Sequence, residues 1–92
     1  RSYKAAVIAF DNFRRNFPDS KYLEELAFLK VEAEFRLAQQ SLPNLQLERF
    51  TLVVSYYHEA VDMYPESKFL KDAEKLYSES QSKINKLKNN NS

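Results

Sequence analysis

The sequence predicts an all-α fold in which four antiparallel helices form stacked helix hairpins. Three observations lead to this fold class. Apolar residues recur at three- and four-residue spacing along most of the 92 residues, which places them on one face of a helix. The three prolines fall between such segments, where they end or separate helices, and glycine is absent. No segment shows the apolar and polar alternation of a strand.

The first two helices are expected over residues 3–17 and 21–40. The first has one apolar stripe, which consists of Tyr3, Ala6, Val7, Phe10, Phe13 and Phe17. Pro18 ends this helix, and Asp19 and Ser20 then offer cap oxygens for the second helix. Acidic residues in the first turn of the second helix suit the positive end of its dipole.

The third and fourth helices are expected over residues 45–64 and 68–87. The break before the third helix contains Pro43, and Pro65 ends that helix. Ser67 is expected to cap the fourth helix. Residues 1–88 are therefore predicted to form one helical domain, and residues 89–92 a frayed polar tail.

The width of each apolar face predicts which helices are central. Apolar residues cover more than half of the circumference of the 21–40 helix, and its polar strip consists of Glu25, Glu32, Arg36 and Gln39. Such a helix should be contacted on two sides. The 45–64 helix has two apolar stripes and should also lie between partners. The 68–87 helix has one narrow stripe, which is typical of a terminal capping helix.

The composition argues against several classes of function. Without glycine the chain has no phosphate-cradling loop, and without cysteine it has neither a disulfide nor a thiolate metal site. The net charge of +1 and the interspersed signs do not resemble the surface of a nucleic-acid-binding protein. The apolar runs are too short to span a bilayer. We expect no cofactor and no catalytic or metal site.

A motif repeats at an offset of 47 residues. Residues 17–23 (FPDSKYL) match residues 64–70 (YPESKFL) at seven consecutive positions. Phe10 and Tyr57 each lie eight residues before the proline of their motif, and Ala6 lies twelve residues before Pro18. This spacing of alanine, aromatic residue and proline is similar to the spacing in the second helix of a tetratricopeptide repeat. The period is longer than the usual value of about 34, so we predict divergent, tetratricopeptide-like repeats with long helices.

Together these features resemble a family of bacterial lipoproteins. The aromatic-Pro-acid-Ser-Lys-aromatic motifs, the Leu47-Glu48-Arg49-Phe50 segment and a lysine-rich last helix resemble the C-terminal repeats of the BamD-type proteins, which belong to the outer-membrane β-barrel assembly machinery. The resemblance covers nearly the whole chain. It implies that earlier repeats and a lipid-bearing N-terminus precede Arg1.

The resemblance also implies a function. It places the chain at the periplasmic face of the bacterial outer membrane, as a non-catalytic scaffold that binds the barrel-forming subunit of the assembly machinery. The lipid anchor outside this fragment would be its one link to the membrane. The proline-acid-serine motif also occurs in other periplasmic repeat proteins, so a peptide-binding or Tol-Pal-associated repeat domain is the alternative. A regulatory domain of an enzyme is a third possibility.

Five residues are candidates for partner binding. Lys30 and Glu34 lie one helical turn apart and intrude on the apolar arc of their helix. They either pair with each other at the edge of a helix interface or face a groove that receives a partner. Leu52, Tyr56 and Met63 form a second apolar patch on the third helix, which either packs inside the fold or recruits a partner.

The remaining polar residues are interpreted as solvated or structural. His58 is the single histidine and sits at the border of a polar face, so we expect it to be solvated and not a ligand. The glutamates of the second helix, Glu34 included, are expected to be solvated and not to form a catalytic acid pair. Arg49 is expected to fix the start of the third helix or to pair with the second helix.

Overall fold

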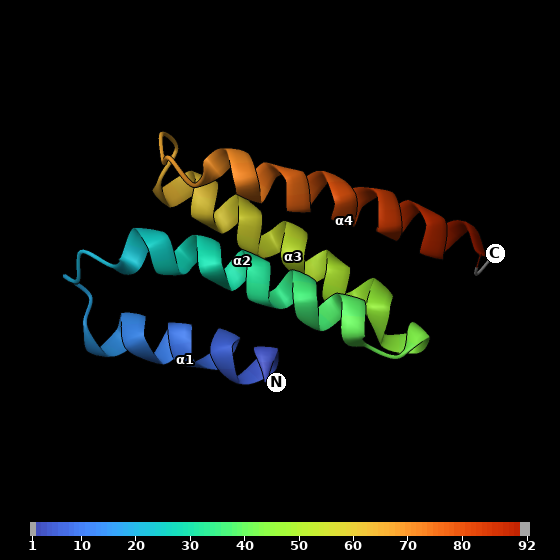
Figure 1. The fold of residues 1–92 in the computed structure, drawn as a ribbon, viewed down its shortest axis with the longest axis horizontal. Helices are drawn as coiled ribbons and strands as arrows, with labels where there is room; N and C mark the ends of the chain where they lie inside the picture. The colour runs from blue at the N-terminus through green and yellow to red at the C-terminus, as the bar shows by residue number, and fades with distance from the viewer. Residues whose placement is uncertain (1, 91–92) are drawn as a thin grey trace.

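Four long helices make up the fold of the computed structural model, which describes residues 2–90. They are α1 (Tyr3–Asn16), α2 (Leu23–Gln40), α3 (Pro43–Met63) and α4 (Leu70–Asn90). Figure 1 shows that each helix runs antiparallel to the one before it. Within residues 2–90 there is no strand, which confirms the predicted all-α class.

The two proline corners have the same local geometry. Phe17 and Tyr64, the last residues before the prolines, have φ and ψ of −134° and 63° and of −136° and 66°. In each corner the serine Oγ accepts a hydrogen bond of 3.1 Å from the amide two residues later, Ser20 from Tyr22 and Ser67 from Phe69. The matching motifs therefore encode matching turns.

These turns correct the predicted helix starts. Each serine also accepts, at its carbonyl oxygen, a hydrogen bond from the amide three residues later, Ser20 from Leu23 and Ser67 from Leu70. A tight turn thus precedes each α-helix, so α2 and α4 begin two residues after the predicted positions 21 and 68. Ser20 and Ser67 stabilise the turns and do not cap the helices themselves.

Two helix ends extend beyond the predicted positions, whereas α1 and α3 end one residue before the predicted positions 17 and 64. α3 begins at Pro43 and not at residue 45, because proline fits the first turn of a helix, where no amide hydrogen is needed. α4 continues to Asn90, so the polar end predicted to fray is helical up to that residue; residues 91–92 lie outside the part that the structure describes. Arg49 Nη1 donates a hydrogen bond of 2.7 Å to Ser41 Oγ, which links α3 to the end of α2 as expected.

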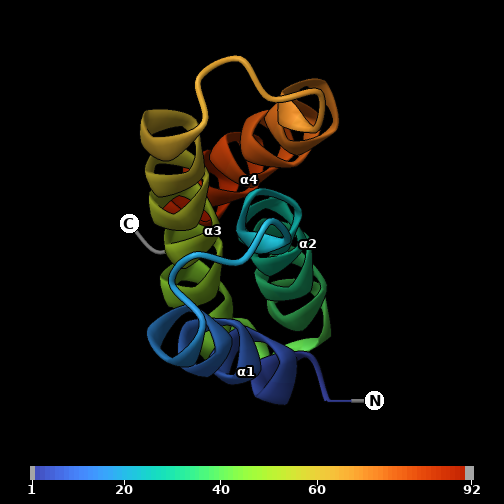
Figure 2. The same cartoon turned by 90° about the vertical axis from the view of Figure 1, so that its left-hand side faces the viewer.

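The helices pack around α2. Viewed along the bundle in Figure 2, α2 and α3 lie side by side, with α1 on one side of them and α4 on the other. α2 contacts all three other helices, and α3 contacts α2 and α4, so the predicted central positions are confirmed. The most deeply buried apolar side chains come from these two helices: Val31, Phe35, Ala38, Phe50 and Val53.

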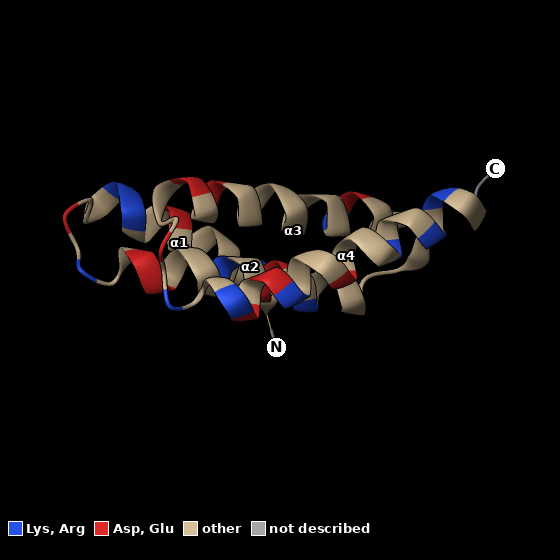
Figure 3. Ribbon diagram, turned by 90° about the horizontal axis from the view of Figure 1, so that it is seen from above, with Lys and Arg blue, Asp and Glu red and all other residues tan. Residues whose placement is uncertain are grey.

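The outer helices bury little by comparison. Only Val7 and Phe10 of α1 are fully buried, and α4 buries Ala73, Ser80 and Ile84, which agrees with its narrow apolar stripe. Figure 3 shows the positions of basic and acidic residues interspersed along the ribbon, with lysines concentrated near the end of α4. Among the described residues no helix combines the length and the apolar character needed to cross a membrane.

The core makes a first prediction. Phe35 is 1% exposed and its ring meets that of Phe50 edge to face, with centroids 5.8 Å apart. We expect Phe35→Ala to lower the free energy of unfolding by about 3–5 kcal/mol, because it leaves a cavity between α2 and α3. Urea unfolding followed by circular dichroism measures this loss.

Leu42→Ala is the control, because Leu42 is 68% exposed. It should change the free energy of unfolding by about 0.5 kcal/mol or less. If Phe35→Ala fails to unfold cooperatively, Phe35→Leu should show a smaller loss of the same sign. Equal stability of the Phe35 and Leu42 variants would contradict this description of the core.

Candidate docking surface

Lys30 joins three helices from inside the fold. Its side chain is 8% exposed, and its Nζ lies 3.0 Å from Asp11 Oδ1 of α1 and 3.9 Å from Glu59 Oε1 of α3. The same Nζ lies 4.0 Å from the ring centroid of Tyr56. Two carboxylates and an aromatic face thus compensate a charge that would be costly to bury alone. Lys30 is therefore engaged within the fold.

The alternative in which Lys30 pairs with Glu34 is wrong. Among the described residues, ion pairs join Lys30 to Asp11 and Glu59 and Arg36 to Glu32, and none involves Glu34. Sequence spacing places Lys30 and Glu34 one turn apart, but α1 and α3 bring closer carboxylates to the lysine. The choice of partner thus depends on the tertiary structure.

Glu34 is buried, which corrects the interpretation that it is solvated. It is 3% exposed, and its Oε2 has no hydrogen-bond partner. Burial raises the pKa of the Glu34 carboxyl above its ordinary value, although the positive charges of Arg49 and Lys30 oppose this shift. Glu34 is thus a destabilising residue in its ionised form.

Three of the five candidate residues meet in one cleft. Glu34, Leu52 and Tyr56 line a small cleft between α1, α2 and α3, and Lys30 covers the Tyr56 ring from α2. Tyr56 and Leu52 are partly buried, so packing accounts for much of their apolar surface. Met63 lies near the C-terminal end of α3, does not line this cleft and is exposed. The predicted patch on α3 therefore does not form one surface, because Met63 lies apart from Leu52 and Tyr56.

Two grooves open along α2. One of them, of about 550 Å³, lies between α1 and α2, and its lining includes the candidate Lys30 together with Phe10, Phe13, Leu26 and Leu29. A second groove of about 310 Å³ lies between α2 and α4. Glu25 and Leu29 line both, so the two grooves meet along α2. We call this continuous surface the α2 face.

Leu29 lies where the two grooves of the α2 face meet, and it is not among the five candidate residues. It is 47% exposed, although leucine is among the residues most often buried. A signal was present in the sequence, because Leu29 lies on the polar strip of its helix, one turn from both Glu25 and Glu32. A leucine in the middle of a polar strip indicates an exposed apolar contact point.

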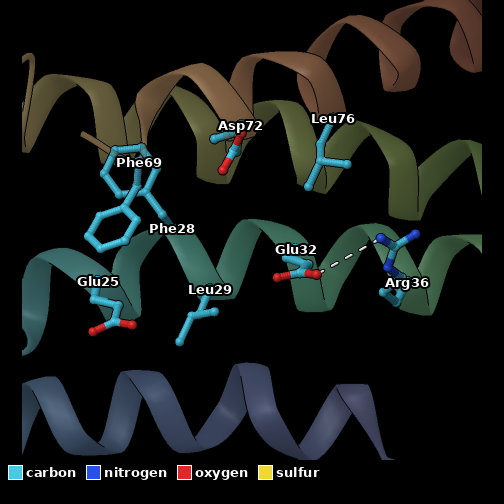
Figure 4. A pocket seen from close by; sticks show the side chains of 9 residues that line it. Glu25, Phe28, Leu29, Glu32, Arg36, Phe69, Asp72 and Leu76 are labelled. Atoms are coloured by element: carbon cyan, nitrogen blue, oxygen red, sulfur yellow. Dashed lines mark ion pairs between the residues drawn. The ribbon is translucent and has the colours of Figure 1, made fainter. Parts of the chain in front are cut away.

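The groove between α2 and α4 has an apolar floor and a charged rim. Figure 4 shows the rings of Phe28 and Phe69 meeting between the two helices, and their centroids lie 6.1 Å apart. Asp72 and Leu76 project from α4 toward α2. Glu32 and Arg36 pair across one turn of α2 at 3.9 Å. Such a surface can bind a polypeptide segment by burying apolar side chains between charged ones.

Comparison with known proteins does not assign the chain to a family. No protein-family model matches it, and no curated protein is significantly similar to it.

Within residues 2–90 no group of three or more His, Cys, Asp or Glu side chains is placed to hold a metal ion. His58 is exposed, as expected, and its ring contacts the rings of Tyr57 and Tyr77 with centroids 5.7 and 5.3 Å away. The exposed Leu29 and the two grooves that meet there make the α2 face the candidate functional feature.

The Lys30 contacts make a second prediction. Asp11→Asn should lower the free energy of unfolding by about 1 kcal/mol, because it weakens a charged hydrogen bond whose Asp11 side chain is 45% exposed. Hydrogen exchange should become faster in α1, which packs mainly on α2. Urea unfolding and exchange by mass spectrometry measure the two effects.

Glu32→Gln is the matched control, because it removes one carboxylate from an exposed ion pair. It should cost about 0.5 kcal/mol or less. The interpretation of Lys30 is wrong if both substitutions have the same effect and leave the exchange of α1 unchanged.

A third prediction concerns the pH dependence of stability that the buried Glu34 causes. At neutral pH we expect Glu34→Gln to be more stable than the parent, because it removes a buried, ionised carboxylate. As the pH falls from the raised pKa to the ordinary value of 4.5, the folded parent takes up the proton before the unfolded chain does, and the difference in stability closes. Below 4.5 no difference should remain.

Urea unfolding at a series of pH values tests this expectation. Glu79→Gln is the control, because Glu79 is exposed and its substitution should give a nearly constant difference. A Glu34→Gln variant that is less stable than the parent at neutral pH would show that the carboxylate is stabilising instead.

Proposed function

We propose that the chain is a non-catalytic scaffold that binds another protein, and that it belongs to an outer-membrane protein assembly lipoprotein of the BamD type. The observation that supports binding is the α2 face, where the half-exposed Leu29 joins two apolar grooves. Contiguous exposed apolar surface on a folded chain marks a site of association.

In this proposal the helices are tetratricopeptide-like repeats. Two features support it. The corners before α2 and α4 share their dihedral angles and hydrogen bonds at an offset of 47 residues. α2 and α4, which follow these equivalent corners, also contact each other, as equivalent helices of neighbouring repeats do. Rigid, stacked hairpins would present the α2 face in a fixed shape and so reduce the ordering cost of binding.

The proposed partner is the barrel-forming subunit of the outer-membrane assembly machinery. This part of the proposal, together with the periplasmic location and a lipid anchor outside the chain, depends on the resemblance of the two corner motifs and the lysine-rich α4 to BamD-type proteins. The chain would contribute surface complementarity and no chemistry.

The alternative is a repeat domain of another periplasmic protein, one that binds peptides or works with the Tol-Pal system. The groove between α2 and α4 favours this alternative, because its Phe28 and Phe69 floor could receive a segment lying along both helices. A peptide bound there, without recovery of an assembly subunit, would support it.

A pull-down from cell envelopes of the source bacterium tests the proposal. The tagged parent chain should recover the barrel-forming subunit, identified by mass spectrometry. Leu29→Glu should reduce recovery about tenfold or more, because it places a charge at the centre of the proposed contact. Circular dichroism should show an unchanged helix content, since Leu29 is half exposed.

Leu42→Glu is the matched control. It is the same substitution at a more exposed leucine that lines neither groove, and it should leave recovery unchanged. If the parent recovers no barrel-assembly subunit, or if both variants recover as much as the parent, the proposed function is wrong.

A further inference from the structure

The groove between α2 and α4 is lined by the same pair of residue types from both helices. Glu25 and Leu29 lie one turn apart on α2, and Asp72 and Leu76 lie one turn apart on α4. The offset of 47 residues that relates the corner motifs also relates Glu25 to Asp72 and Leu29 to Leu76. The fold thus brings two copies of an acid-leucine pair to one groove (Figure 4).

The acidic members of these pairs have no partner of their own. Within residues 2–90 neither Glu25 nor Asp72 forms an ion pair, and both side chains are exposed. Each lies in the first turn of its helix, where a negative charge is favourable. That position explains the two acidic residues. The leucine one turn later is 47% exposed on α2, at Leu29, whereas on α4 Leu76 is partly buried and packs against the core at the edge of the groove.

The residues that line the groove carry an excess of negative charge. Its lining residues carry three carboxylates, from Glu25, Glu32 and Asp72, and one cation, Arg36. Arg36 pairs with Glu32, which leaves the two unpaired carboxylates beside the apolar floor. A positively charged group is the complement of such a site, and an apolar side chain is the complement of its floor.

We propose that this groove binds a segment of the partner protein in which lysine or arginine alternates with large apolar residues. This inference rests on the proposed function and specifies the chemistry of the partner. The apolar side chains would cover Phe28, Phe69 and the two leucines, and the cations would pair with Glu25 and Asp72. Because the groove contains two equivalent acid-leucine pairs, we expect the segment to contain at least two pairs of a basic residue and a large apolar residue.

Short synthetic peptides test the specificity directly on the whole chain. The fluorescein-labelled probe SSLKLKLSS should bind in fluorescence anisotropy. Two matched peptides, SSLELELSS and SSSKSKSSS, lack the positive charge or the apolar side chains, and should bind at least about fivefold more weakly. Raising the salt concentration should weaken binding of SSLKLKLSS, because exposed ion pairs are screened.

Variants of the chain locate the site. The double variant Glu25→Gln with Asp72→Asn should weaken binding of SSLKLKLSS roughly threefold to tenfold, and should abolish most of its salt dependence. The control pair, Glu66→Gln with Glu79→Gln, changes the net charge equally at exposed residues outside the groove and should leave affinity unchanged. Helix content should be measured for both, since Glu25 and Asp72 also lie in first turns.

Three results would overturn this inference: no binding of SSLKLKLSS, equal binding of SSLELELSS, or an unchanged affinity of the Glu25 and Asp72 variant. The envelope pull-down separates this failure from that of the proposed function. Recovery of the barrel-forming subunit that depends on Leu29 but not on Glu25 and Asp72 would keep the scaffold and reject the basic segment. Binding of SSLKLKLSS without recovery of that subunit would keep the basic segment and reject the barrel-forming subunit as the partner.

Discussion

The burial of α2 is the constraint on which the rest of the structure depends. Apolar side chains surround most of this helix, and it is stable only where α1, α3 and α4 cover them. Its residues Val31, Phe35 and Ala38 are almost completely removed from water. The outer helices bury fewer residues and pack against this centre, so the fold is organised around one helix and not around a shared central cavity.

The same constraint explains the two buried charges. Because neighbouring helices cover α2 on several sides, neither Lys30 nor Glu34 is exposed to solvent. Lys30 is compensated by Asp11, Glu59 and the Tyr56 ring, which come from two other helices. Glu34 has no comparable partner, and burial raises its pKa. Of the two charged candidates, only Lys30 therefore holds α1 and α3 to α2.

Where the neighbours of α2 leave a gap, the surface is suited to binding. Leu29 stands between the grooves toward α1 and α4, and the carboxylates of Glu25 and Asp72 flank the second groove. Stacked helices hold these side chains in a fixed arrangement before any partner arrives, which lowers the entropic cost of association. The proposed docking function and the proposed preference for a basic, apolar segment both follow from this one exposed side.

The sequence by itself determined the number of helices, their order, the equivalent corners and the central place of α2, because periodicity, proline and apolar coverage are local properties. It could not fix the helix starts at Leu23 and Leu70, since both serines form turns instead of caps. The polar strip around Leu29 signals its exposure, but only the tertiary structure decided that Lys30 pairs with Asp11 and Glu59 and that two grooves meet at Leu29. Both depend on distances between helices, which no spacing along one helix contains.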